Sequence, residues 1–550
     1  MTGDRENAKV ALAGGATAAD LLGALLRQAS AEYPQVFSGL TLPGEPVQLK
    51  TRMAELLPQF EAARIQSTQA AEIARALCLG AAAHLRCGES QDSAAQSPPA
   101  LAQLLERPVA PLSLVRVDLP GPGRLRASAD FGGRLYRGAE LEQLANELEL
   151  AHFATKATTA ALTQLGQGTA SGGVSLAGQR FVLFGAGAEL SPVYALLEAG
   201  AEVLWLDRQR PPIDHLLEPR LAGALLYVDA GSGGVDLLAQ PAQVRATILE
   251  FAEGGPVHFG LHAFASGQSG PLLVSLVMNE IVRSLPRALV RSVSYLLSPT
   301  SVSFVAPEDA AVADERRSAA PTLRRALLRT GSLQAGHLSV RQQRLSCAVV
   351  QQQGASFQVA EYIAKRLAAE ALASYGNTLD GGPGQAVFAN MAPITNTRSL
   401  ASPLMKASIL GAPSYDLLIA EPSTARSVCA LLTVHDLTNI GTDAAAPLTP
   451  VRVPVHDLAT DGTDENGESR TGTGTGTRTT LTETQSQTQN QTEMDGLHPV
   501  DAHAAALART FALQFHGGVQ AQPYALEGIV RLAALRGIAQ RPKLAWEFWR

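Results

Sequence analysis

The spacing of hydrophobic and polar residues changes near residue 180. Before that point, apolar residues recur three and four positions apart over 16–33 and 49–85, which predicts amphipathic helices. Residues 111–138 carry short apolar runs around a Pro-Gly turn and predict a β-hairpin, and residues 139–165 predict one long helix. After residue 180, short apolar runs alternate with helical spacing, which predicts parallel strands joined by helices.

The fold class expected is therefore α/β, a doubly wound parallel sheet that follows a mostly helical N-terminal region. Six apolar runs have the length of buried strands: 181–184, 203–207, 223–229, 256–262, 292–298 and 386–391. Helical patterns cover 191–199, 236–252, 270–285, 355–374, 402–411 and the segment "EPSTARSVCALLTVHDL", where Pro422 suits a first helical turn.

Composition divides the chain into five parts. Residues 166–179 are rich in glycine and serine, as in a hinge. Residues 456–497 are polar with almost no apolar side chain, which predicts a disordered insertion. The other expected parts are an N-terminal helical region with a short β-hairpin (1–165), a sheet domain (180–455) and a C-terminal helical tail (498–550).

Charge and composition narrow the classes of function. The chain has 550 residues, a formal net charge of −6 and a pI of about 6.0. No bulk positive charge therefore favours binding to nucleic acid or to an anionic membrane. No apolar run reaches the roughly 18 residues of a membrane span, and the first residues lack the order of a signal peptide. We expect a cytoplasmic protein with an unknown small-molecule substrate; an organellar location and a homo-oligomer remain open.

Cysteine and histidine give no sign of a disulfide or metal site. The four cysteines have no paired spacing, and the 11 histidines form no metal-binding pattern. We therefore expect reduced, buried thiols and no metal.

The strongest chemical signal is the segment "FVLFGAGAELSPVYALLEAGAEVLWLDR" at 181–208. Gly185 and Gly187 allow a sharp turn and the close approach of a ligand, because neither carries a Cβ atom. The next helix would direct free N–H groups at an anion. Asp207 ends the following strand, where a carboxylate can bind ribose hydroxyls. Together these features predict a nucleotide site.

Two residues modify this prediction. Glu189 lies where a pyrophosphate would bind, and its charge would repel a phosphate. Because there is no third glycine, the segment also suits a fold in which the glycines serve only strand–helix packing. Arg208 could meet a 2′-phosphate and so favours NADP over NAD, although a surface arginine needs no such role.

Later segments carry a family resemblance. The third strand ends in "VDAG", a helix lies in "GPLLVSLVMNEIVRSLP", and the fifth strand runs into "YLLSPTS". In this order they resemble the short-chain dehydrogenase/reductase superfamily, whose Rossmann fold mostly serves NAD(P)-dependent hydride transfer. The resemblance implies that Asp229 lies near the adenine and that Asn279 holds a catalytic water. It also implies that Ser298, or Thr300, orients the carbonyl.

The helix "SFQVAEYIAKRLAAEAL" stands where that family keeps its catalytic tyrosine and lysine. Tyr362 would be the proton donor, and Lys365 would lower its pKa. Their spacing is YxxK rather than the family's YxxxK, so an amphipathic helix with a half-buried tyrosine is the alternative. Ser346 is a second candidate for the serine. His262, close to the expected cofactor, is interpreted as a satisfied core or edge histidine.

The segment "NMAPITNT" resembles the family's loop at the nicotinamide, with Pro393 and Thr397 as the matching residues. Several short segments, among them "GAGAELSP" and "HGGVQAQPY", resemble a divergent, uncharacterised subgroup of Rossmann proteins. That likeness implies a fold and adds no reaction.

Three functions remain. The first is an NAD(P)-dependent oxidoreductase acting on a carbonyl or alcohol of a small molecule, with Tyr362, Lys365, Ser298 and Asn279 as catalytic residues. The second is a non-catalytic NAD(P)-binding regulator or scaffold of the same fold. The third is an S-adenosylmethionine-dependent methyltransferase, whose first two strands the glycine segment also resembles.

Overall fold

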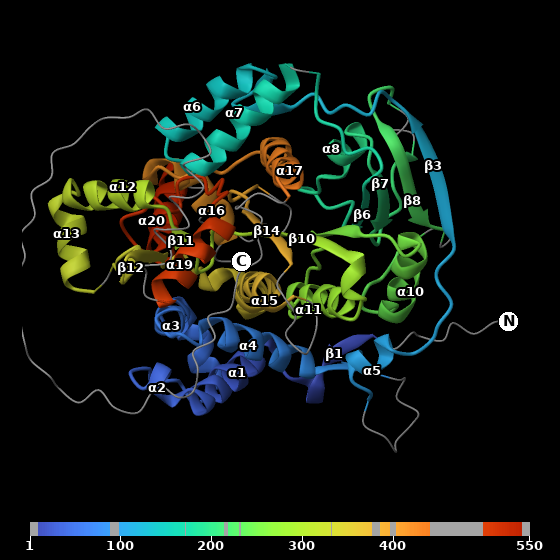
Figure 1. The fold of residues 1–550 in the computed structure, drawn as a ribbon. Helices are drawn as coiled ribbons and strands as arrows, with labels where there is room; N and C mark the ends of the chain where they lie inside the picture. Colours follow the sequence, from blue (N-terminus) through green and yellow to red (C-terminus); the bar gives the residue numbers. More distant parts are fainter. Residues whose placement is uncertain are drawn as a thin grey trace, which may run out of the picture.

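The predicted alternation of strands and helices is confirmed by a computed structural model of the chain (Figure 1). It describes residues 9–88, 98–170, 172–213, 218–229, 233–331, 333–376, 385–396, 403–440 and 499–541. The predicted disordered insertion, 456–497, lies outside these residues.

A seven-stranded sheet forms the centre of the molecule, in the order β14-β10-β9-β6-β7-β8-β3. Six of its strands are parallel and match the six predicted runs. They are β6 (Arg180–Phe184), β7 (Glu202–Leu206), β8 (Ala222–Val228), β9 (Val257–Leu261), β10 (Val290–Leu297) and β14 (Ala386–Met391).

Helices cover both faces of the sheet, because successive strand residues point to opposite sides. Val182 and Phe184 of β6 pack with α10 (Pro241–Ala252) and α11 (Gly270–Arg283). Phe181 and Leu183 pack with the helices of the other face. Those helices are α6 (Glu140–Leu150), α7 (Lys156–Ala170), α8 (Val193–Glu198) and α17 (Pro422–Thr438).

The N-terminal helices form a further layer outside α11 (Figure 1, lower part). Its main helices are α1 (Ala18–Glu32), α3 (Pro46–Ile65) and α4 (Ala70–Ala83). α1 begins at a capping box in which the Thr17 side chain accepts from the Asp20 N–H and the Asp20 carboxylate accepts from the Thr17 N–H. The layer packs on three consecutive helical elements that precede β14: α14 (Ala355–Val359), the π-helix η4 (Ala360–Leu367) and α15 (Ala368–Tyr375).

The predicted β-hairpin and long helix need correction. Strand β3 (Leu114–Pro120) pairs antiparallel with β8, so it extends the main sheet instead of forming the hairpin. The hairpin is β4 (Ser128–Phe131) with β5 (Arg134–Arg137), turned by two glycines in left-handed conformation. The single helix predicted over 139–165 is two helices, α6 and α7, because the chain turns at His152, whose φ is 53°. α7 also extends through the first residues of the predicted hinge.

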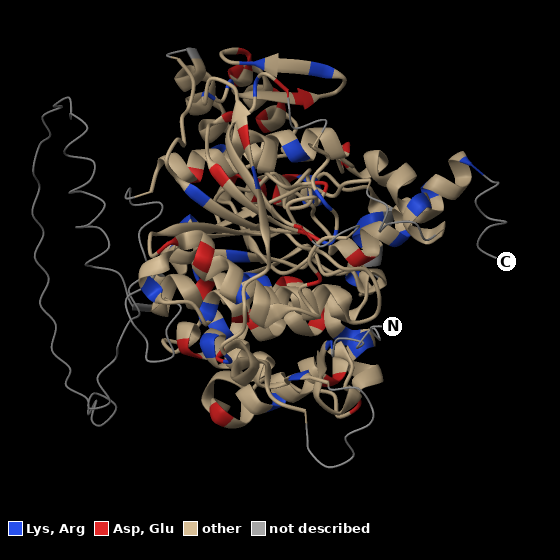
Figure 2. Ribbon diagram, turned by 90° about the vertical axis from the view of Figure 1, so that its right-hand side faces the viewer, with Lys and Arg blue, Asp and Glu red and all other residues tan. Residues whose placement is uncertain are grey.

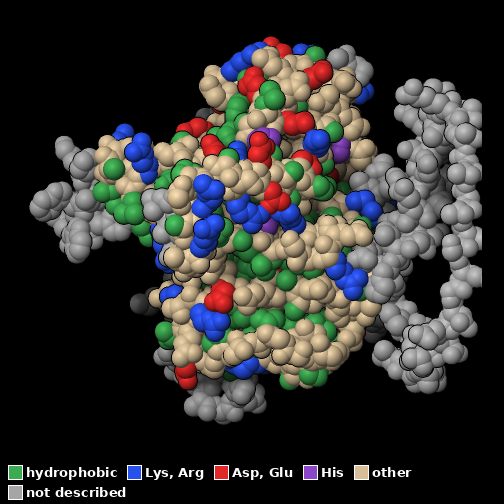
Figure 3. Space-filling view, turned by 90° about the vertical axis from the view of Figure 1, so that its left-hand side faces the viewer, with side chains coloured by type: hydrophobic (Ala, Val, Ile, Leu, Met, Phe, Trp, Pro, Cys, Tyr) green, Lys and Arg blue, Asp and Glu red, His purple; other side chains and the backbone are tan. Residues whose placement is uncertain are grey.

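The segment between β10 and η4 forms a small region of its own at one end of the molecule. It contains α12 (Pro307–Ser318), α13 (Thr322–Arg329) and a three-stranded antiparallel sheet of β11 (Phe304–Val305), β13 (Gln343–Ser346) and β12 (His337–Val340). Arg317 and Arg344 both pair with Asp314, and these contacts lower the pKa of that carboxyl to about 2. On the side of the molecule that lies at the left in Figure 1, basic and acidic side chains are interspersed (Figure 3). The same mixture of charges is seen along the ribbon in a second view (Figure 2).

The C-terminal part contains helices, as predicted for this tail, and it packs on the sheet domain. α20 (Leu526–Gln540) packs on α16 (Pro403–Gly411) so closely that a Cβ atom on Gly411 would lie 1.9 Å from the Ala533 carbonyl oxygen. α19 (Pro499–Thr510) brings His503 to the N-terminal layer.

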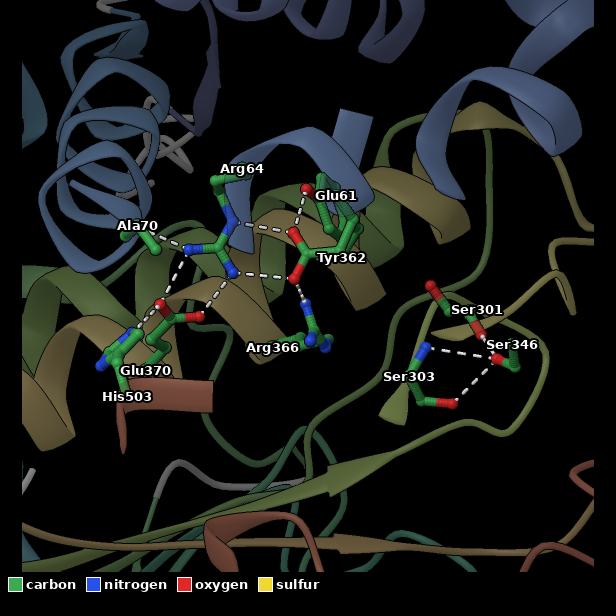
Figure 4. Close-up of polar contacts among 10 residues, drawn as sticks. All are labelled: Glu61, Arg64, Ala70, Ser301, Ser303, Ser346, Tyr362, Arg366, Glu370 and His503. Carbon is green, nitrogen blue, oxygen red and sulfur yellow. Dashed lines mark hydrogen bonds and ion pairs between the residues drawn. The ribbon is translucent and has the colours of Figure 1, made fainter. Parts of the chain in front are cut away.

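A buried ion network joins the N-terminal layer to the sheet domain (Figure 4). Arg64 of α3 donates to both carboxylate oxygens of Glu370 at 2.8 and 2.7 Å, to Glu61 and to the Ala70 carbonyl. Arg366 of η4 pairs with Glu61, and His503 contacts Glu370 at 3.1 Å. Burial opposes the ionisation of Glu370, but Arg64 and His503 outweigh it and lower its pKa to about 2. Two carboxylates and two guanidinium groups therefore balance each other inside the protein.

Among the described residues, no helix is long and apolar enough to cross a membrane, and no group of three or more His, Cys, Asp or Glu side chains is placed to hold a metal ion. All four cysteines are free thiols, and three of them are buried.

Candidate functional site

The candidate site lies at the carboxyl ends of the parallel strands. After β6 the chain continues to β7 on one side, whereas β9 pairs with β6 on the other side. Strand order thus reverses between β6 and β9, and ligands of open α/β sheets bind in the crevice outside such a point.

Gly185 follows β6 at this reversal of strand order, and the backbone there requires a glycine. Its φ is 77°, and an added Cβ atom would lie 2.4 Å from the N and Cα atoms of Ala263. Its N–H donates to the Leu206 carbonyl at 2.7 Å. Close packing between the β6 and β9 loops is therefore a sufficient reason for the first glycine of the motif.

Gly187 and Asp207 are joined directly. The exposed Gly187 donates its N–H to Asp207 Oδ2 at 3.0 Å, and the other carboxylate oxygen accepts the Gln209 N–H at 2.9 Å. The carboxylate predicted to bind ribose is thus held at the mouth of the crevice by two backbone donors. A Cβ atom on Gly187 would approach this carboxylate to 3.3 Å.

The helix after the glycines is shorter than the predicted 191–199. α8 has six residues and begins at Val193, after the turn that Pro192 ends. A short helix that starts eight residues beyond Gly185 cannot direct its first N–H groups at an anion beside that glycine. Glu189, the predicted obstacle to a phosphate, is exposed.

Arg426 is a residue of this site that the sequence did not reveal. It lies on α17 and donates from Nε to the Glu189 carbonyl at 2.6 Å, which places a guanidinium over the glycine loop. The two residues are 237 positions apart. No local pattern could have connected them.

Two ion pairs lie where the adenine of a dinucleotide is expected to bind. Arg210 donates to Asp229 at 2.7 Å, so the carboxylate predicted near the adenine has a partner. Arg208 is 72% exposed, and its nearest acid is Asp236 at 3.7 Å. Arg208 is therefore accessible from solvent on the same edge of the sheet as Asp207.

At the end of β10, the structure brings Ser298 together with Glu361 and Lys365. Glu361 accepts the Ser298 N–H at 2.8 Å and the Lys365 ammonium at 2.5 Å. Lys365 also donates to the Leu296 carbonyl at 3.0 Å. The Ser298 hydroxyl contacts Thr300, which in turn donates to Gln353 at 2.7 Å. Ser298 and Lys365 are thus close, as the family resemblance implied.

Tyr362 points away from this cluster, in contrast to its predicted catalytic role. Its hydroxyl donates to Glu61 at 2.7 Å in the ion network (Figure 4), and the residue is fully buried. Burial first, and then the Glu61 charge, raise the pKa of Tyr362 well above its usual range. A proton donor activated by lysine needs the opposite shift.

Glu361 takes the position that sequence reasoning gave to Tyr362. It precedes Lys365 by four residues, which is the spacing that the family shows between tyrosine and lysine. Residues four apart lie on one face of a helix, and the π-helical turns of η4 keep both side chains at the carboxyl end of β10. The signal for Glu361 was therefore present in the sequence.

The remaining predicted residues contribute packing and connections. The Asn279 amide donates to the Ala364 carbonyl at 2.5 Å and accepts from the Tyr295 hydroxyl at 3.0 Å, so it links α11, η4 and β10. Pro393 is buried after β14, and Thr397 lies outside the described residues. Ser346 bonds to Ser303 at 3.0 Å and to the Ser301 carbonyl (Figure 4).

No protein-family model matches this chain, and no curated protein is significantly similar to it. The interpretation of the site therefore depends on its own geometry. That geometry has two halves, with Gly187, Asp207 and Arg426 on one side and Ser298, Glu361 and Lys365 on the other.

Replacing Tyr362 by phenylalanine tests the corrected role of this side chain. We expect the free energy of unfolding to fall by about 1.5–3 kcal/mol, since a bond to a buried carboxylate is lost. Ligand binding should not change. Tyr295→Phe, which removes a bond to the neutral Asn279, is the matched control and should cost about 1 kcal/mol in urea unfolding. If Tyr362→Phe instead abolished turnover and left stability unchanged, the tyrosine would be catalytic after all.

Proposed function

We propose that this chain is a nicotinamide-dinucleotide-binding protein of the Rossmann type, a divergent relative of the short-chain dehydrogenases/reductases. The observation that carries the proposal is the strand order β8-β7-β6-β9-β10-β14, with a glycine turn after β6 and Asp207 after β7. This is the order 3-2-1-4-5-6 of dinucleotide-binding sheets.

The charges of the crevice support this ligand. Asp207 can exchange a backbone donor for a ribose hydroxyl at little cost, because both are neutral donors. Arg426 supplies a positive charge beside Glu189, which the shortened α8 does not provide. Arg208 lies exposed next to Asp207 and favours NADP over NAD, since a 2′-phosphate would extend toward it.

Non-catalytic binding, as a regulator or scaffold, is the favoured role. The hydroxyl of Tyr362, the expected proton donor, is engaged by Glu61 inside the N-terminal layer. A hydride transfer to a carbonyl needs a proton donor at the reacting oxygen, and this tyrosine does not reach the cluster at Ser298.

The second candidate function is an oxidoreductase, and one observation supports it. Glu361 and Lys365 lie four residues apart beside Ser298, and this pair could transfer protons in place of a tyrosine. Glu361→Gln would then abolish consumption of NADPH in the presence of small aldehydes and ketones. For a regulator, neither the wild type nor the variant would consume NADPH.

The binding proposal is tested by thermal denaturation with NADPH, NADH and S-adenosylmethionine added separately. We expect a dinucleotide to raise the unfolding temperature, with NADPH above NADH. Asp207→Ala should weaken binding about tenfold, because a hydrogen bond to a charged group is lost. Asp118→Ala, an exposed acid on β3, is the control and should bind as the wild type does. Stabilisation by S-adenosylmethionine alone, or by none of the three, would contradict the proposal.

A further inference from the structure

His262 directly follows β9, at the point where the strand order reverses. Its N–H donates to the Phe184 carbonyl at 2.9 Å, which continues the pairing of β9 with β6. Its ring leans back over Gly260, where an added Cβ atom would lie 2.9 Å from Cδ2 and Nε2. The glycine therefore makes room for the imidazole, and the backbone of both strands fixes its position.

Neither ring nitrogen of His262 has a hydrogen-bond partner within the described part of the chain, and both are buried. This differs from the satisfied histidine that the sequence predicted. Buried polar groups in proteins are almost always paired, and an unpaired one costs stability. The residue as a whole is only half-buried, and it lies at the carboxyl end of β9, where the strand order reverses. An unpaired group that destabilises the fold at this place points to a ligand.

The surroundings of His262 define the kind of group that it would bind. Burial first, and then the nearby Lys365, lower the pKa of His262 to about 4, so its ring is neutral at pH 7. A neutral imidazole offers one donor and one acceptor. The Lys365 charge is balanced by Glu361 at 2.5 Å. A neutral hydroxyl suits this environment, whereas a phosphate would need more positive charge.

We propose that His262 hydrogen-bonds a hydroxyl of the ribose on the nicotinamide side of the bound dinucleotide. This inference rests on the proposed function and names the half of the ligand that β9 and β10 recognise. Asp207 lies across the β6–β9 crevice and binds the adenosine half. The two halves of a dinucleotide lie on opposite sides of such a point.

Two variants of His262 test the inference by titration with the preferred reduced dinucleotide and with its adenosine half (2′,5′-ADP for NADPH, ADP for NADH). We expect His262→Leu to bind the dinucleotide about tenfold more weakly and the adenosine half as the wild type does. Without ligand it should unfold at the same or a higher temperature, because an unpaired buried polar group is removed. His262→Gln, which keeps a donor and an acceptor, should recover most of the affinity.

The possible failures are distinguishable. If the wild type binds neither compound, the proposed function is wrong, and this inference is lost with it. If the wild type binds both but His262→Leu binds the dinucleotide equally well, only the role of His262 is wrong. A leucine variant that unfolds well below the wild-type temperature, or loses both affinities equally, would show a structural histidine and overturn the inference.

Discussion

Arg64→Met should lower the free energy of unfolding by about 3–5 kcal/mol, the usual cost of removing one partner from a buried ion pair. Every N–H of the Arg64 guanidinium has an acceptor, and its side chain is fully buried with those of Glu61 and Glu370 (Figure 4). Methionine fills part of the space but leaves Glu61 with Arg366 and the Tyr362 hydroxyl, and Glu370 with His503. The expected result is a marked fall in the midpoint of urea unfolding.

Arg52→Met on the same helix is the matched control. Arg52 pairs with Glu55 at 3.3 Å, and the two side chains are 43% and 39% exposed, so the loss should stay below about 1 kcal/mol. Equal losses for the two variants would mean that the network does not hold the N-terminal layer. Replacing Glu61, Arg64, Arg366 and Glu370 together by apolar residues should restore part of the stability, because no unpaired charge is then buried.

Gly185→Ala should destabilise the protein by about 3 kcal/mol, whether or not a nucleotide is present. The left-handed φ of 77° costs about 1–2 kcal/mol for a residue with a Cβ atom. The contact of 2.4 Å with the Ala263 backbone adds an overpacking cost of about 1–3 kcal/mol, since a backbone cannot rotate away as a side chain can.

Gly187→Ala distinguishes the effect of a glycine on stability from its effect on nucleotide binding. Gly187 is exposed, and its nearest contacts to an added Cβ atom are 3.1 Å or longer, so its stability loss should stay below about 1 kcal/mol. Its effect should appear in nucleotide affinity, because the methyl group displaces the Asp207 carboxylate. Urea unfolding and nucleotide titration of both variants measure the two effects. If Gly185→Ala were as stable as the wild type, the packing explanation for the first glycine would be wrong.

The sheet could be predicted from the sequence because each buried strand is a short apolar run between turns. All six predicted strands lie within two residues of the observed ones. Strand β3 could not be assigned to the sheet in this way, because it pairs with β8 across about 100 residues. The residues of β3 alternate between exposed and partly buried side chains, as they do in an ordinary hairpin strand.

The candidate site was predicted in part. Gly185, Gly187 and Asp207 were found because they are local to one strand–turn–strand unit. The assignment of Tyr362 as proton donor does not fit its observed contact, because spacing shows which residues share a helix face and does not show what that face contacts. Glu61, the partner of Tyr362, is 301 residues away. Arg426 was missed for the same reason, since its contact is with a backbone atom 237 residues away. His262 was interpreted as a satisfied histidine, because the sequence does not show that both of its ring nitrogens lack a partner among the described residues.

The ion network also has a consequence for the order in which the chain folds during synthesis. Arg64 is made early, but its partner Glu370 follows 306 residues later, and His503 later still. Until Glu370 has left the ribosome, the N-terminal helices cannot dock without burying an incompletely paired charge. We therefore expect the first helices to be synthesised to be among the last to reach their final positions.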